Sequence, residues 1–165
     1  MKCTKIILAS YKNFDGALKA IDKRIESKCY YSFSDTRPCE RIAEEVFSLI
    51  RKKSSLLALK SKVDKVFSLL DPIEKDLLRC KYLDKKPENK FKFSLRTYFR
   101  KQAKLFMKLD EYFSFIGICD EKFFEEFKSN SFMMCAKIKA EDVKRVRCSF
   151  LENADEEKKL LRKTA

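Results

Sequence analysis

Apolar residues recur every three or four positions along most of the chain, and this periodicity predicts a protein built almost entirely from helices. The first predicted helix covers residues 4–29, where the apolar residues follow one another at helical intervals: Phe14, Leu18, Ile21 and Ile25. The segment YYSFSDTRPCE, residues 30–40, then interrupts the pattern. It contains residues typical of a helix start, so we expect a boundary between two helices there.

Residues 38–70 contain no helix breaker after Pro38, and a near-heptad row of apolar residues runs along them: Ile42, Val46, Leu49, Leu56, Val63 and Leu70. We expect a bend at Ser54 and Ser55. Because a loop of only about ten residues separates this segment from the first helix, the two are predicted to form a long antiparallel hairpin. The alternative is a coiled-coil-like arm over 38–70 that mediates dimerisation or docking.

Asp71 and Pro72 are typical of a helix start, with Asp as the N-cap residue and Pro at the first helical position. The predicted helix covers residues 72–83 and turns four side chains toward a core: Ile73, Leu77, Leu78 and Tyr82. A polar loop is expected at residues 85–89.

The next predicted helix begins after Ser94, a good N-cap residue, and ends near Gly117. It is amphipathic. The residues expected to face the core are Leu95, Tyr98, Phe99, Leu105, Phe106, Leu109, Tyr112 and Phe113. The residues expected on the opposite side are Arg96, Thr97, Arg100, Lys101, Lys104 and Lys108.

Asp120 is the predicted N-cap of a short helix that carries Phe123, Phe124 and Phe127. Beyond Ser129 the apolar residues predict one or two further helices packed on the bundle: Phe132, Met133, Met134, Ile138, Val143, Val146 and Phe150. Residues 152–165 are mostly charged and are expected to form a frayed helical tail.

The composition agrees with an all-α helical bundle, because the 165 residues include only two Gly and three Pro but fifteen Phe to fill a core. We expect three parts within one compact domain: a helical hairpin over 1–70, a basic segment over 71–118, and C-terminal helices with a charged tail over 119–165.

Positive charge is concentrated in residues 81–108, which hold ten Lys or Arg but only Asp84 and Glu88 as acids. The whole chain carries a net charge of +13. A basic helix side is usually only a solvated face, but a face of one sign favours an anionic partner. We expect nucleic acid rather than a membrane surface.

Several kinds of chemistry are disfavoured by the sequence. The chain has no His, and neither a glycine-rich phosphate loop nor a G-x-S-x-G motif is present. The seven cysteines do not follow zinc-ligand spacing, so they are expected to be reduced and buried: Cys3, Cys29, Cys39, Cys80, Cys119, Cys135 and Cys148. We therefore predict no enzyme activity, no cofactor, no metal and no small-molecule ligand.

The first residues hold an apolar run only at 6–9, which is shorter than the apolar core of a signal peptide. No stretch approaches the length of a membrane span. A cytoplasmic protein without a membrane partner is expected.

Two stretches, LLDPIEKDLLRCKYLDKK and SLRTYFRKQAKLFMKL, resemble region 4 of the sigma-70-like factors and related phage transcription regulators. The matching residues are Leu77, Leu78, Lys81, Tyr82, Ser94, Arg96, Thr97, Arg100, Leu105 and Leu109. They cover about a quarter of the chain. In that family a short helix lies between the two stretches, whereas only LDKKPENKFKF stands there in this sequence.

The resemblance implies a helix-turn-helix-like segment that binds double-stranded DNA in bacterial or phage transcription, with a homodimer or the transcription machinery as further partners. Arg96, Thr97 and Arg100 are expected to reach base edges. Phosphate contacts are expected from Lys101, Lys104 and Lys108, and from the preceding loop residues Lys85, Lys86, Lys90 and Lys92. The alternative is a non-enzymatic interaction or adaptor module for an acidic protein or RNA, with 38–70 as its arm.

Overall fold

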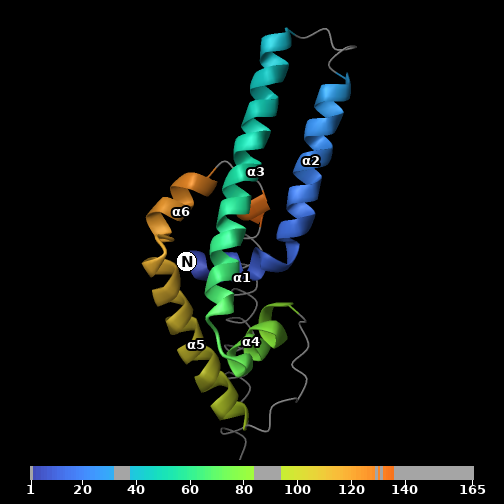
Figure 1. Cartoon of the computed structure of the whole chain (residues 1–165). Helices are drawn as coiled ribbons and strands as arrows, with labels where there is room; N and C mark the ends of the chain where they lie inside the picture. The colour runs from blue at the N-terminus through green and yellow to red at the C-terminus, as the bar shows by residue number, and fades with distance from the viewer. Residues whose placement is uncertain (1, 32–37, 84–93, 129, 131, 136–165) are drawn as a thin grey trace, which may run out of the picture.

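The computed structural model describes residues 2–31, 38–83, 94–128, 130 and 132–135. Within these ranges the chain is all-α and contains no strand, which confirms the predicted fold class (Figure 1). The α-helices are α1 (Cys3–Ser10), α2 (Phe14–Tyr31), α3 (Cys39–Ser68), α4 (Pro72–Leu78), α5 (Leu95–Phe115) and α6 (Asp120–Phe127). A 3₁₀ turn, η1 (Tyr11–Asn13), precedes α2, and a π-helical turn, η2 (Arg79–Leu83), follows α4.

The predicted antiparallel hairpin is confirmed, because α2 and α3 run side by side in opposite directions (Figure 1). Ion pairs link the two helices along their length: Lys28 with Glu45, Lys53 with Asp22, and Lys60 with Asp15. The predicted bend in the second helix is wrong, since α3 continues unbroken through Ser54 and Ser55. Serine costs a helix only about 0.5 kcal/mol relative to alanine, which is too little to interrupt a packed helix.

The predicted first helix is divided in two at the 3₁₀ turn η1. The Ser10 hydroxyl donates to the Ile6 carbonyl oxygen at 2.7 Å, a backbone contact that often accompanies a helix bend. At the turn, the ring of Tyr11 packs edge-on against Phe67 with 4.7 Å between centroids, and its hydroxyl meets Asp64. Burial, helped by the hydrogen bond to Asp64, raises the pKa of Tyr11 to about 12. The turn redirects the chain, so α1 and α2 take different directions.

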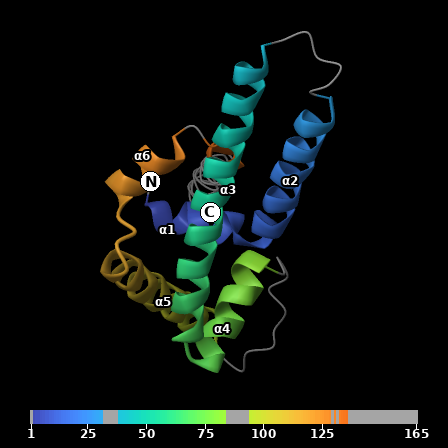
Figure 2. The same cartoon turned by 45° about the horizontal axis from the view of Figure 1, so that its top comes forward.

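Helix α1 forms the centre of the core. Its consecutive residues Ile6, Ile7 and Leu8 are all buried, as expected of a helix that is apolar on several sides. In both views α1 crosses behind α3 (Figures 1 and 2). The other helices contribute core side chains that include Leu18, Leu56, Leu59, Val63, Val66, Leu77, Leu78, Leu105, Leu109, Phe113, Phe123 and Phe127.

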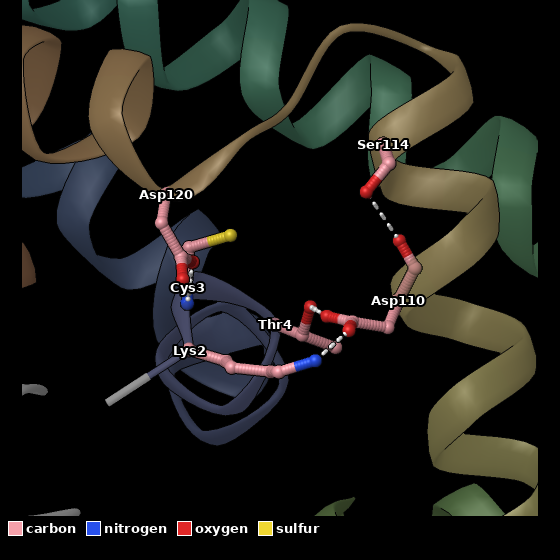
Figure 3. Close-up of polar contacts among 6 residues, drawn as sticks. All are labelled: Lys2, Cys3, Thr4, Asp110, Ser114 and Asp120. Atoms are coloured by element: carbon pink, nitrogen blue, oxygen red, sulfur yellow. Dashed lines mark hydrogen bonds and ion pairs between the residues drawn. The ribbon is translucent and has the colours of Figure 1, made fainter.

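Two aspartates hold the start of α1 in place (Figure 3). The backbone N–H of Cys3 donates to Asp120 Oδ1 at 2.7 Å, at the first turn of α6. The buried Thr4 hydroxyl donates to Asp110 Oδ1 at 2.8 Å, and Lys2 pairs with the same carboxylate. Residues far apart in sequence therefore fix the position of the central helix.

The predicted helix boundaries are largely confirmed. A capping box between Asp71 and Glu74 begins α4, and the Ser94 side chain caps α5. Gly117 has φ +80° and ends α5, with Gly117 N–H donating to the Ser114 carbonyl and Ile118 N–H to the Phe113 carbonyl. The predicted N-cap of the next helix is wrong by one residue, because α6 begins at Asp120 itself and its N-cap residue is Cys119.

Three predictions of burial are wrong. Phe99 is 60% exposed and Ile73 is 52% exposed, because the first turns of α5 and α4 lie at the end of the bundle (Figure 1). Most of the described cysteines are exposed or half-buried, and only Cys3 is buried, where burial raises its pKa to about 12. Cys148 and most of the helices predicted beyond Ser129 lie outside the described residues. In the ranges that the structure describes, no helix is both long enough and apolar enough to cross a membrane.

Candidate nucleic-acid interface

The start of α5 is fixed by its cap. The backbone N–H of Thr97 donates to Ser94 Oγ at 3.3 Å, and the two hydroxyl oxygens lie 3.0 Å apart. The Thr97 side chain is half-buried and engaged in this cap. Its predicted contact with a base edge stays a prediction.

The rest of α5 anchors the helix in the bundle. Leu105, Leu109 and Phe113 are buried in the core, and they recur at intervals of four residues. Leu105 and Leu109 meet Leu77 and Leu78 of α4 around a small internal space. The N-terminal half of α5 thus belongs to a helix that is held in the core.

Three cations are aligned along the exposed side of this half of the helix. Arg96, Arg100 and Lys104 recur every four residues, so they lie one above the other on the helix surface, and all three are exposed. We call these three residues the basic face. None of the residues that the structure describes supplies a carboxylate to pair with them.

Lys108, one turn further along, has a partner. Its Nζ lies 2.9 Å from both carboxylate oxygens of Glu74, which links α5 to α4. This hydrogen bond raises the pKa of Lys108. Burial opposes ionisation of Glu74, but the bonds from Lys108 and from the Asp71 backbone outweigh it and lower the pKa of Glu74. Lys108 therefore has a structural role in addition to its predicted phosphate contact.

The other predicted contact residues are either partly buried or outside the described residues. Lys101 is half-buried at the edge of the exposed side. The loop residues Lys85, Lys86, Lys90 and Lys92 lie outside the described residues. The structure thus brings together Arg96, Arg100 and Lys104, which form the core of the predicted site.

Two apolar residues beside the basic face were not predicted. Phe99 and Met107 are 60% and 65% exposed, and Phe99 packs edge-on against Tyr98 at 5.5 Å between centroids. Their place beside the basic face can be recognised from the sequence, because Phe99 lies three residues after Arg96 and Met107 lies three residues after Lys104. Residues at that spacing share one side of a helix.

The pair α4 and α5 has one feature of a helix-turn-helix, a basic helix packed on the helix before it. It lacks another, the turn of three or four residues. The π turn after α4 ends at Leu83, whereas α5 begins at Leu95. No protein-family model, curated protein or solved structure matches the chain in the comparisons.

Proposed function

We propose that the protein binds double-stranded DNA through the basic face of α5 and acts in transcriptional control. The observation that carries this proposal is the row of three exposed cations, Arg96, Arg100 and Lys104, on a helix whose opposite side is held in the core. Elsewhere in the bundle, several lysines that lie at helix contacts have carboxylate partners. A preformed row of unpaired cations binds a polyanion without first breaking ion pairs of its own.

The dimensions suit a duplex. At 1.5 Å per residue, the basic face is about 12 Å long, comparable to the width of the major groove. Arg96 and Arg100, nearest the helix start, have the fork geometry that contacts guanine or phosphate with two hydrogen bonds. Lys104 lies further along, where recognition helices usually follow the DNA backbone.

A charge-reversal experiment with a matched control tests the proposal. Arg96, Arg100 and Lys104 are changed together to Glu, and the control changes three exposed cations of α2, Lys19, Lys23 and Arg24, to Glu. Both variants lose the same net charge. We expect the first to lose at least about 100-fold in affinity for random-sequence duplex, measured by fluorescence anisotropy, and the control to lose much less. Equal losses in two folded variants would reject a specific role for α5.

The exposed Phe99 and Met107 favour a second candidate function, an adaptor that binds RNA or an acidic protein. The unpaired bases of single-stranded RNA stack on exposed aromatic side chains. The bases of duplex DNA are paired and stacked on one another, so they are not available for this contact. Competition between labelled duplex and unlabelled single-stranded RNA separates the two functions. The second function would be favoured if RNA displaces the labelled duplex at a concentration well below the concentration of unlabelled duplex that does so. Phe99→Ala should then weaken the competition by RNA.

A further inference from the structure

Helix α3 carries a second regular row of side chains on its exposed side, next to the side that pairs with α2. Its members are all exposed and uncharged: Ala43, Phe47, Ile50, Ser54, Leu57 and Ser61. We call this row the α3 stripe. Its spacing alternates between four and three residues, which is the repeat of a coiled-coil seam.

The large side chains of the stripe are unusually open for apolar residues. Phe47 is 62% exposed, Leu57 46% and Ile50 45%. The ion pairs from α3 to α2 involve Glu45, Lys53 and Lys60, which lie on a different side of α3. Phe47 also borders a hollow between α3 and α6, which Glu126 and Phe127 line from the α6 side. The rest of this uncharged heptad row is not used by its own hairpin, and such a row is suited to packing against another helix.

Charged residues along one flank of the stripe show which helix fits. Glu40 and Glu44 lie near the start of α3, and Lys62 and Lys65 lie near its end. All four are exposed, and no described residue pairs with them. This flank of α3 is thus acidic toward one end and basic toward the other, whereas Arg41 and Asp64 lie on other sides of the helix. The flank complements itself only when two copies run antiparallel.

The apolar and charged residues agree on one register. With Phe47 opposite Leu57 of a second copy, Ile50 lies opposite Ser54 and Ala43 opposite Ser61. In the same register Glu44 comes within two residues of the level of Lys62. Glu40 comes within one residue of the level of Lys65 and is level with Asp64, whose carboxylate accepts a hydrogen bond from the Tyr11 hydroxyl. Each of these contacts occurs twice about a two-fold axis.

We propose that the α3 stripe is a homodimer interface, in which a second copy of this chain packs its own α3 antiparallel. The proposal is independent of DNA binding by α5. Arg51, exposed on the charged flank near the two-fold axis, would lie close to Arg51 of the second copy. This repulsion predicts a weak dimer, and so do the small side chains at Ala43, Ser54 and Ser61, which bury little apolar surface. Arg51→Gln removes the repulsion and should tighten the dimer several-fold.

Analytical ultracentrifugation of the full-length chain, from about 10 µM to about 1 mM, tests the proposal. We expect the average mass to rise toward twice the monomer mass. Phe47→Glu combined with Ile50→Glu should abolish the rise, whereas Phe115→Glu, at a 92% exposed position on α5, should leave it unchanged. Helical circular dichroism confirms that each variant is folded.

Charge exchange tests the register. Glu44→Lys and Lys62→Glu should each weaken the dimer several-fold, and the double variant should restore it, because the two exchanged positions then carry opposite charges again across the interface. Parallel pairing predicts no such coupling, because Glu44 and Lys62 then lie at different levels of the two helices and do not meet across the interface. Two results would overturn the proposal. The first is a wild-type chain that stays monomeric throughout the concentration series, which is the result expected if its own residues 136–165 cover the stripe. The second is a double variant whose dimer is as weak as that of the single variants.

Discussion

Asp110 illustrates how single residues hold this fold together. Its carboxylate accepts a hydrogen bond from the buried Thr4 hydroxyl and pairs with Lys2, so one side chain of α5 positions the start of α1 (Figure 3). Burial opposes ionisation of this carboxyl, but the bonds from Lys2 and Thr4 outweigh it and lower the pKa of Asp110. The charged form is therefore the one that stabilises the folded state.

We predict that Asp110→Ala lowers the free energy of unfolding by about 1–3 kcal/mol, because it leaves the buried Thr4 hydroxyl without an acceptor. Asp110→Asn keeps an acceptor and should cost less. Since the folded-state pKa lies below the ordinary 3.8, this contribution is present above pH 3.8 and is lost as the pH falls through the lower value. Urea denaturation at neutral and acidic pH measures both effects. Equal stability of wild type and Asp110→Ala at pH 7 would refute this role.

Aromatic residues of α5 differ sharply in what they contribute. Phe113 is fully buried and Phe99 is 60% exposed, although the helical pattern predicts both in the core. We predict a loss of about 3–5 kcal/mol for Phe113→Ala and less than about 1 kcal/mol for Phe99→Ala, measured by the same denaturation. A large loss for Phe99→Ala would show that this residue is covered in solution.

At the scale of elements, the sequence signals that involve backbone chemistry were the most reliable. The capping residues Asp71 and Ser94 and the terminating Gly117 are confirmed, because caps depend on local hydrogen bonds that few residues can supply. The 3₁₀ turn at Tyr11–Asn13 was not predicted, since no Gly or Pro marks it and it depends on contacts with Phe67 and Asp64.

Predictions that depend on where the bundle ends were the least reliable. Helical periodicity shows which side of α5 is apolar, but not how far that side extends beyond its neighbours, and Phe99 was assigned to the core for that reason. The same limit applies to the site. The row Arg96, Arg100 and Lys104 follows from spacing alone, whereas the link between Lys108 and Glu74 depends on how α4 packs on α5.

Replacing the two glycines by alanine should change the stability of the fold in opposite directions. Gly117 has φ +80°, so Gly117→Ala should cost about 1–2 kcal/mol at the end of α5. Gly16 lies within α2, and an added Cβ would meet no atom within 4 Å, so Gly16→Ala should stabilise by up to about 1 kcal/mol. Thermal or urea denaturation of both variants tests the pair. The same sign for both would contradict the helix boundaries described above.

Among the cations of the whole molecule two classes contrast, while further exposed cations such as Lys62 and Lys65 also have no carboxylate partner among the described residues. At helix contacts, lysines pair with carboxylates, as in Lys53 with Asp22 and Lys108 with Glu74. On the first turns of α5, the three cations of the basic face have no such partner among the described residues. The first class stabilises the bundle, and we infer that the second provides the attraction for DNA.

The salt dependence of duplex binding tests this central inference most directly. On random-sequence duplex, which offers no preferred base, we expect Arg96, Arg100 and Lys104 all to contact phosphates. Each phosphate contact contributes about 0.9 to the slope of log affinity against log salt concentration, so changing the three together to Ala should flatten the slope by about 2.7. Fluorescence anisotropy with random-sequence duplex across a salt series gives both slopes. A folded triple variant with the slope and affinity of the wild type would show that the basic face does not contact DNA.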